Sequence, residues 1–186
     1  MHLPIRWICL LSGLLAADMA RAEEPPPARQ AAAVAQAAQR VKQIVAHRGA
    51  SSERPENTRA STLRAIEVGA TEVEVDVRTT RDGHLVLLHD ANLARTTNGE
   101  GSVGEKSLEE LQQLDAGSHF DPDYADQQVP TLAQVLEICR GRIDVLLDLK
   151  ESGDVYTRRV VEAVAKHGEP KRTIVGVRSL EQAREF

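Results

Sequence analysis

Short apolar runs alternate with amphipathic stretches along the chain from residue 44 onward. The runs are rich in Val, Ile and Leu and are bounded by Gly, Pro or Asp, which predicts buried strands. Helix-like periodicity separates them, and a strand, a helix and a second strand at this spacing imply parallel pairing. The predicted strands are 44–46, 72–78, 143–149 and 173–177, and the predicted helices are 58–68, 131–138, 154–168 and 180–186.

Cap residues and glycines mark the predicted helix ends. Asn57 or Thr58 is expected to cap the first helix, Thr131 the second and Asp154 the third. Gly follows the first three helices, which is typical of a helix stop. The residues predicted to face the core are Leu63 and Ile66 in the first helix and Val155, Val161 and Val164 in the third.

One connection is too short for a parallel crossover. Residues 79–83 alone separate the strand 72–78 from a further apolar run at 85–88, whereas a crossover needs about a dozen residues. The pattern therefore predicts an antiparallel hairpin with Asp82-Gly83 in its turn. Such a hairpin would bring His89 roughly opposite Asp76 and Glu74.

Residues 91–130 are long and mostly irregular, which is typical of a functional lid or an insertion. One short helix, 108–114, is predicted inside this segment, with Ser107 and Glu110 as a capping box. Repeated strand–helix units then leave two architectures open, an open doubly wound sheet and a closed (β/α)8 barrel. The turn His47-Arg48-Gly49-Ala50 lacks the Gly-rich pattern of a nucleotide-binding loop.

The N-terminal residues 1–22 have the pattern of a signal peptide. Arg6 precedes an apolar run at 7–17 that is too short to span a bilayer, and Ala20-Arg21-Ala22 offers a cleavage site. Residues 23–43 are then a linker, and the protein is expected to be periplasmic or secreted, with no stable membrane anchor after cleavage. Cys9 would leave with the signal peptide, so Cys139 remains alone and no internal disulfide is expected.

Charged and polar residues follow the predicted strands at their C-terminal ends, which form the active-site face of a barrel. Glu74 and Asp76 lie on one side of their strand, and Asp148 follows a neighbouring strand. Three converging carboxylates require a cation, and hard oxygen ligands favour Mg²⁺ or Ca²⁺. The sequence therefore predicts a divalent metal site made by Glu74, Asp76 and Asp148.

Two histidines and two cations accompany this predicted metal site. His47 and His89 are candidates for general acid and general base, with the assignment between them open. Arg48 and Lys150 supply the positive charge that a phosphate group needs, and the net charge of −5 argues against a nucleic-acid partner. Glu56 has two readings of equal weight, as a partner of Arg48 or of a ligand, or as a helix-start acid. Asp90 is a candidate for orienting a neighbouring group, and the remaining histidines, His2, His84, His119 and His167, are read as structural.

These residues resemble the motifs of the glycerophosphodiester phosphodiesterase family. The motifs are His47-Arg48-Gly49, Pro55-Glu56-Asn57-Thr58, Glu74-x-Asp76, Asp82-Gly83 and His89-Asp90. The resemblance implies a TIM barrel with an insertion after the second strand, and metal-dependent hydrolysis of glycerophosphodiesters to glycerol 3-phosphate and an alcohol. It also implies that His47 and His89 are the acid–base pair, that Glu74 and Asp76 bind the metal, and that Arg48 and Lys150 bind the phosphate.

The sequence departs from the family pattern in two respects. The family usually has Glu as the third metal ligand, whereas Asp148 stands there and is one methylene shorter. The domain 44–186 also ends after about four strand–helix units, so a truncated barrel, a fragment of a longer enzyme, is expected.

Two other functions remain open. A lysophospholipase-D-like or phosphoinositide-type lipase would bind lipid through apolar residues of the insertion, namely Leu93, Leu111, Leu114, Phe120 and Tyr124. A non-catalytic remnant would bind metal or phosphate without turnover.

Overall fold

The computed structural model describes residues 28–38 and 40–186 of the chain. It divides into two units at the boundary between residues 40 and 41, and the two are described separately. The first unit contains helix α1 (Ala28–Ala38), inside the predicted linker, while the predicted signal peptide lies outside the described residues. None of the helices in the described ranges is both long and apolar enough to cross a membrane.

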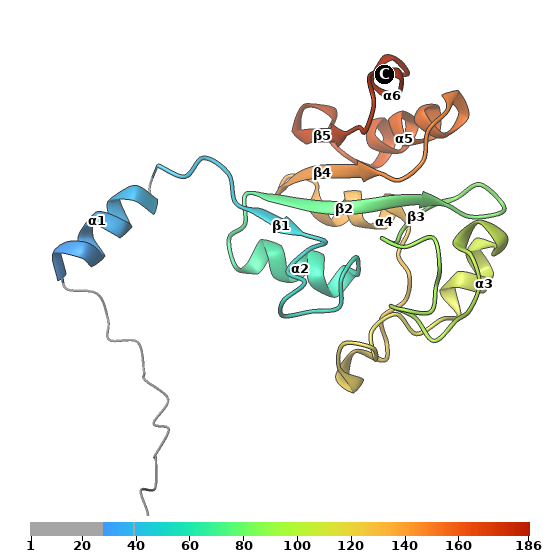
Figure 1. The fold of residues 1–186 in the computed structure, drawn as a ribbon, viewed down its shortest axis with the longest axis horizontal. Coiled ribbons are helices and arrows are strands. Elements are labelled where there is room, and N and C mark those ends of the chain that lie inside the picture. The colour runs from blue at the N-terminus through green and yellow to red at the C-terminus, as the bar shows by residue number, and fades with distance from the viewer. Residues whose placement is uncertain (1–27, 39) are drawn as a thin grey trace, which may run out of the picture. The chain divides into compact units, whose positions relative to one another are not determined.

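Four parallel strands form the centre of the second unit. They are β1 (Val45–His47), β2 (Glu72–Thr79), β4 (Asp144–Leu149) and β5 (Thr173–Gly176), and they lie side by side in the order β1-β2-β4-β5 (Figure 1). This order follows the chain, without the reversal that defines a doubly wound sheet. The sheet is therefore arranged as part of a (β/α)8 barrel, and the doubly wound alternative is not the one adopted.

The helices cover one face of this sheet. Val73, Val75 and Val77 of β2 are fully buried and share one apolar cluster with α2 (Arg59–Glu67), α4 (Leu132–Cys139) and α5 (Asp154–His167). Residues alternate between the two faces of a strand, so Glu74 and Asp76 lie on the opposite face. The sheet thus has an apolar side that carries the fold and an acidic side that is left for the site.

Helix α2 buries small residues where larger ones were predicted. Its buried residues are Ser61, Thr62 and Ala65, whereas Leu63 is 37% exposed and Ile66 is only partly buried. The loop after β1 approaches the helix closely, since the Ala50 N–H donates to the carbonyl oxygen of Ser61 at 3.0 Å. Leu63 does not face the core, so its prediction was wrong, whereas Ile66 packs against the core as a partly buried residue.

Helix α5 also differs from its predicted start and face. Gly153 occupies the cap position at φ 110°, which favours glycine, and Asp154 is the first helical residue. Val155 and Val161 are 61% and 47% exposed, because the buried stripe follows a different set of positions. That stripe consists of Tyr156, Thr157, Val160 and Val164, so of the three valines predicted to face the core, Val164 alone does so.

The strand β3 (Leu85–Leu87) pairs with the end of β2 in antiparallel orientation. The register places Val77 opposite Leu87, and the Leu88 N–H donates to the carbonyl oxygen of Asp76 at 3.1 Å. Leu88, and not His89, therefore lies opposite Asp76, which corrects the predicted position by one residue. Leu88 turns into an apolar cluster, and His89 follows it at the strand end.

Residues 91–130 fold around a small core of their own. They contain η1 (Val103–Glu105), α3 (Leu108–Gln112) and η2 (Pro122–Tyr124). Ser107 and Glu110 form the predicted capping box of α3, and Thr131 caps α4 in the same way. The core beneath these elements consists of Val86, Leu88, Leu93, Val103, Leu111, Ala116 and Val129. The short helix η3 (Pro170–Arg172) precedes β5, and α6 (Leu180–Arg184) follows it.

Candidate active site

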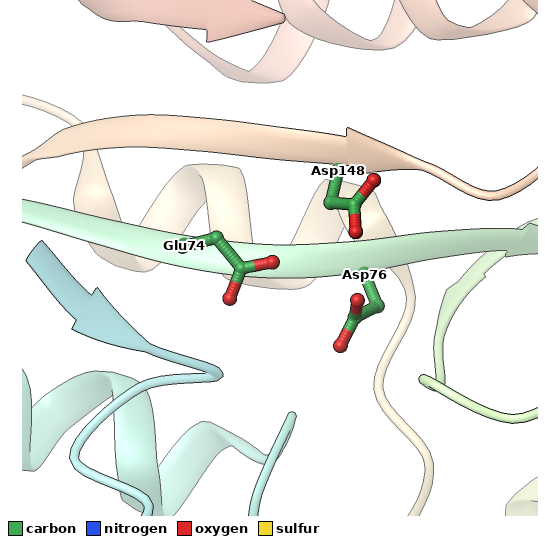
Figure 2. A group of neighbouring side chains, drawn as sticks. All are labelled: Glu74, Asp76 and Asp148. Carbon is green, nitrogen blue, oxygen red and sulfur yellow. The ribbon is translucent and has the colours of Figure 1, made fainter. Parts of the chain in front are cut away.

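Three carboxylates meet on the acidic face of the sheet. Asp76 and Asp148 are direct neighbours in the register of β2 and β4, and Glu74 precedes Asp76 by two residues on the same face. Figure 2 shows the three side chains projecting toward the same side. Each offers an oxygen within 4.8 Å of the others, and Glu74 and Asp76 are buried. The predicted metal ligands are thus brought together.

Glu74 and Asp148 have pKa values shifted in opposite directions. Burial raises the pKa of Glu74, and the neighbouring Asp76 adds to this, although the Arg48 N–H donates to Glu74 Oε2 at 2.8 Å and opposes it. Burial also acts to raise the pKa of Asp148, but Lys150 and Arg178 outweigh it and hold that pKa below its usual value. The site therefore resists carrying all of its negative charge without a further cation.

Lys150 already contacts two of these acids. Its ammonium lies 2.6 Å from Asp76 Oδ1 and 2.5 Å from Asp148 Oδ2, and its side chain is only 4% exposed. Arg178 adds a second cation at 3.1 Å from Asp148 Oδ2. Lys150 was predicted to contact phosphate, and the structure places it at the edge of the predicted metal site.

The donor set fits a hard divalent cation. All three candidate ligands are carboxylates, which suits Mg²⁺ or Ca²⁺ better than zinc. Buried Asp76 Oδ1 is paired with the Lys150 ammonium at 2.6 Å, so a divalent ion bound here would share this oxygen with Lys150. The fit therefore rests on the three carboxylates, which each offer an oxygen within 4.8 Å of the others. Glu74, Asp76 and Asp148 would hold the ion.

The loop after β1 presses against this site in a left-handed backbone conformation. Arg48 and Asn57 have φ values of 57° and 55°, which are unusual for residues other than glycine. The Asn57 N–H donates to the carbonyl oxygen of Arg48 at 3.0 Å, which joins the two ends of the loop. Arg48 Nε lies 3.4 Å from Asp76 Oδ2 and has no hydrogen-bond partner among the described residues.

The two candidate acid–base histidines lie at the ends of β1 and β3. His47 is the register partner of Glu74, and its Nε2 lies 3.9 Å from Glu74 Oε2. His89 Nδ1 lies 2.7 Å from Asp90 Oδ1, so Asp90 orients the histidine next to it. Arg78 donates to the carbonyl oxygen of His89 from Nε and Nη2, at 3.1 and 2.7 Å.

Glu56 and Arg95 join the loop after β1 to the insertion. Arg95 donates to both oxygens of Glu56, at 2.9 and 2.8 Å, and to Asp90 Oδ2 at 2.5 Å. Arg48 Nη1 also donates to Glu56 at 3.2 Å. Burial acts to raise the pKa of Glu56, but the two arginines bring it below its usual value. Of the two readings of Glu56, the structure supports the partner of Arg48.

Arg95 and the amide of Asn57 were missed in the sequence reasoning as parts of the site. Arg95 lies in the insertion and is separated by 39 positions from Glu56, so no local pattern links the two. The available signal was its position five residues after Asp90.

Known proteins match this chain over its strand–helix part. The sequence profile of the Glycerophosphoryl diester phosphodiesterase family matches residues 47–170. A glycerophosphodiester phosphodiesterase of Caldanaerobacter subterraneus is 42% identical over 137 residues, covering 71% of this chain and 56% of that protein. The human glycerophosphodiester phosphodiesterase 1 is 34% identical over 162 residues, covering 85% of this chain and 47% of that protein.

Solved structures are similar to the same part of the chain. The glycerophosphodiester phosphodiesterase of Agrobacterium tumefaciens matches with a TM-score of 0.72 and 39% identity, over 78% of this chain and 62% of that one. A phosphodiesterase of Oleispira antarctica, solved with the product sn-glycerol-3-phosphate, matches with a TM-score of 0.69 and 35% identity, over 75% and 58%. The chain thus spans about half the length of the curated relatives that it matches.

Proposed function

The chain belongs to the glycerophosphoryl diester phosphodiesterase family, and we propose that its site hydrolyses glycerophosphodiesters to sn-glycerol 3-phosphate and an alcohol. The observation that supports this most is the meeting of Glu74, Asp76 and Asp148 beside His47 and Arg48 at one edge of the sheet. Because the chain spans about half the length of its relatives, their activity comes to it as part of this proposal.

Arg48 and Lys150 are proposed to bind the phosphodiester. The Nε group of Arg48 is a donor without a hydrogen-bond partner in the described part of the chain, next to Asp76. Its guanidinium can donate to a phosphate oxygen while Glu56 holds its Nη1. The Lys150 ammonium forms ion pairs with Asp76 and Asp148. A phosphate bound beside these acids would also contact this ammonium, so Lys150 would neutralise part of the phosphate charge as well.

His47 and His89 are proposed to move the protons. One imidazole takes a proton from the nucleophile, either water or the neighbouring glycerol hydroxyl, and the other gives a proton to the departing alcohol. The two side chains come from different strand ends, which allows them to act on opposite sides of the phosphorus. His89 is oriented by Asp90, and His47 lies beside Glu74.

A divalent cation, Mg²⁺ or Ca²⁺, is proposed as cofactor at Glu74, Asp76 and Asp148. When bound, such an ion neutralises the phosphate charge that develops during displacement. The chain's own part is to hold the three carboxylates close together. Arg48, through its backbone N–H, and Lys150 assist in this.

A small soluble substrate is favoured over a lipid. Of the five insertion residues that would have to bind lipid, Leu93 and Leu111 are fully buried in the core of the insertion. Tyr124 contacts Phe120 edge-on and lies under the Arg54 guanidinium, 5.4 Å from its ring centre. The insertion therefore offers little continuous apolar surface for an acyl chain.

We also propose a periplasmic or secreted location, on the basis of the signal peptide predicted for residues 1–22.

Release of glycerol 3-phosphate from glycerophosphocholine tests this function. The chain is assayed with Mg²⁺, with Ca²⁺ and with a chelator, and the variants His47→Gln and His89→Gln are compared with it. We expect metal-dependent release that falls by about 10²–10⁴-fold in either variant. His167→Gln is the matched control, because His167 pairs with Glu137 on the surface at 2.7 Å.

Each outcome separates the candidate functions. Metal-dependent turnover lost in both site variants and kept in the control supports the proposal. Binding of metal or of glycerol 3-phosphate without turnover would favour the non-catalytic remnant. Release of choline from lysophosphatidylcholine vesicles, faster than from the soluble diester, would favour the lipase.

A further inference from the structure

Arg95 is the centre of an ion-pair network that links the insertion to the loop after β1. Its guanidinium contacts two carboxylates: Nη1 and Nη2 contact Glu56, and Nε contacts Asp90. Glu56 also accepts from Arg48, and Asp90 lies 2.7 Å from His89 Nδ1. A continuous line of charged contacts thus runs from the phosphate-binding arginine to one of the two candidate acid–base histidines.

This arrangement gives Arg95 a role different from that of Arg48. Three of its five N–H groups donate to carboxylate oxygens of Glu56 and Asp90, so its positive charge is already matched by two acids of the protein. Arg48, by contrast, has an Nε that makes no hydrogen bond within the described residues and lies 3.4 Å from Asp76 Oδ2. The geometry therefore indicates that Arg95 positions Glu56 and Asp90.

His89 is the residue that this network immobilises. Arg78 holds its backbone carbonyl oxygen with two hydrogen bonds, and Asp90 holds its ring through Nδ1. Asp90 divides its oxygens between His89 and Arg95, one each. Arg95 and, after it, His89 lower the pKa of Asp90 to about 2, so Asp90 is an ionised, acceptor-only partner.

We propose that Arg95 is a positioning residue: it holds Asp90 so that the His89 proton stays on Nδ1 and Nε2 is left for the reaction. An ionised aspartate can only accept, so the ring nitrogen facing it must carry the hydrogen. Without Arg95, Asp90 is free to rotate toward solvent and the imidazole can adopt either tautomer. This role deepens the function proposed above and rests on it.

The same contact ties the insertion to the body of the domain. Glu56 lies in the loop after β1, and Arg95 lies in the insertion, 39 positions away. The Arg95 side chain is 46% exposed, so its ion pairs are solvated and are expected to add little to stability. A group with this placement should therefore affect turnover more than folding.

Kinetics of three variants test this role. Arg95→Met is expected to lower kcat by about 10–100-fold and to leave KM nearly unchanged, since it orients a reacting group without touching substrate. Arg95→Lys keeps the charge but not the planar fork, so we expect it to recover little. Arg81→Met is the control, because Arg81 also anchors the insertion, donating to the carbonyl oxygen of Glu105 and to Glu110. It should leave kcat and KM unchanged.

Nitrogen NMR of the His89 ring gives a readout that does not depend on activity. The ring signals are assigned from their loss in His89→Gln. In the unmodified chain we expect a single neutral tautomer with the proton on Nδ1, and in Arg95→Met a mixture of tautomers. Asp90→Asn removes the ionised acceptor and should give the same mixture of tautomers. It is the variant to use if Arg95→Met does not fold.

The outcomes separate this inference from the proposed function. An Nδ1-protonated ring that becomes mixed in Arg95→Met, with a melting temperature within ~3 °C of that of Arg81→Met, supports positioning. A His89 ring that is identical with and without the Arg95 side chain overturns it, whatever the activity. Absence of hydrolysis by the unmodified chain would defeat the proposed function and leave the NMR result standing.

Discussion

Asn57 and Asp76 bind each other through two hydrogen bonds across the site. Asn57 Nδ2 donates to Asp76 Oδ2 at 2.7 Å, and the Asp76 N–H donates to Asn57 Oδ1 at 3.1 Å. Both residues are buried, and Asn57 adopts a left-handed backbone with φ 55°. The amide thus fixes Oδ2 of a candidate metal ligand, while Oδ1 pairs with the Lys150 ammonium at 2.6 Å.

Replacing Asn57 should weaken metal binding. In Asn57→Gly the left-handed backbone is retained but both hydrogen bonds are lost, so buried polar groups of Asp76 are left without partners. We expect a loss of about 1–3 kcal/mol in the free energy of unfolding and about 10–100-fold in affinity for Mg²⁺ or Ca²⁺. Denaturant titration and calorimetry with each metal measure the two effects.

A surface asparagine provides the control for this prediction. Asn92 is exposed and accepts from the Ala94 N–H at 2.9 Å, far in sequence from the three acids. Asn92→Gly should leave metal affinity unchanged. Equal metal affinity in Asn57→Gly and the unmodified chain would show that the amide does not orient Asp76.

Glu74 is expected to destabilise the metal-free protein at neutral pH. Its pKa is raised above 4.5, first by burial and then by Asp76, so the folded state binds its proton more tightly than the unfolded state. Stability therefore falls as pH rises from 4.5 through the folded pKa. Glu74→Gln removes the charge and keeps an oxygen for the Arg48 N–H. We expect it to raise the melting temperature above this pH window, by a few degrees, and to abolish metal binding.

The pH dependence of this gain is its main check. Well below 4.5 the Glu74 carboxyl is protonated in both states, so the melting temperatures of Glu74→Gln and the unmodified chain should converge. Glu110→Gln is the control, and its effect on the melting temperature should have the opposite sign. The backbone and side-chain hydrogen bonds with Ser107 lower the pKa of Glu110, so its charge stabilises the folded state. If Glu74→Gln is less stable than the unmodified chain at neutral pH, then the buried Glu74 charge does not destabilise the metal-free protein, and the prediction is wrong.

The strands and the capped helices could be predicted because their signals are local. Alternation in β2 puts Val73, Val75 and Val77 on one face whatever surrounds them, and the Ser107 and Thr131 caps depend on residues three positions away. The buried faces of α2 and α5 depend on tertiary contacts. Leu63 and Val155 are apolar but lie on the exposed faces of their helices, 37% and 61% exposed, and periodicity alone does not show that.

The convergence of the three candidate ligands could be predicted, and the residues that support them could not. Glu74 and Asp76 share one face of β2 by alternation, and the parallel register of β2 and β4 places Asp148 beside Asp76. The supports, Asn57 and Arg95, come from loops and act over 19 and 39 positions. The path of a loop is decided by its own turns and contacts, which hydrophobic patterning does not record.

Gly49 is expected to be essential for the approach of the site loop to α2. Its φ is 77°, and a Cβ placed on it would lie 2.4 Å from Ser61 Oγ and 2.7 Å from the Ser61 backbone carbon. Gly69 has a similar φ of 79°, but a Cβ there would meet nothing within 4 Å. We expect Gly69→Ala to cost about 1–2 kcal/mol from backbone strain, and Gly49→Ala to cost at least ~2 kcal/mol more, from overpacking.

Denaturant unfolding of the two alanine variants measures this difference directly, because the backbone strain is common to both. The Gly49 variant should also bind metal less tightly, since the displaced loop carries the Arg48 N–H that donates to Glu74. Equal unfolding free energies for the two variants would mean that the loop can move away from α2 at no cost.

Asp148 is expected to serve as a full ligand despite its short side chain. Its oxygens already come within 4.8 Å of those of Glu74 and Asp76, and Lys150 and Arg178 hold it in place. Lengthening it gives no closer approach, so Asp148→Glu should bind Mg²⁺ or Ca²⁺ with about the affinity of the unmodified chain. Asp148→Asn, which removes the charge, should bind about tenfold or more weakly, because ligand charge sets affinity at such sites. Calorimetry measures the metal affinity of the two variants. If Asp148→Glu binds about tenfold more tightly than the unmodified chain, the Asp148 side chain is too short to reach the metal fully.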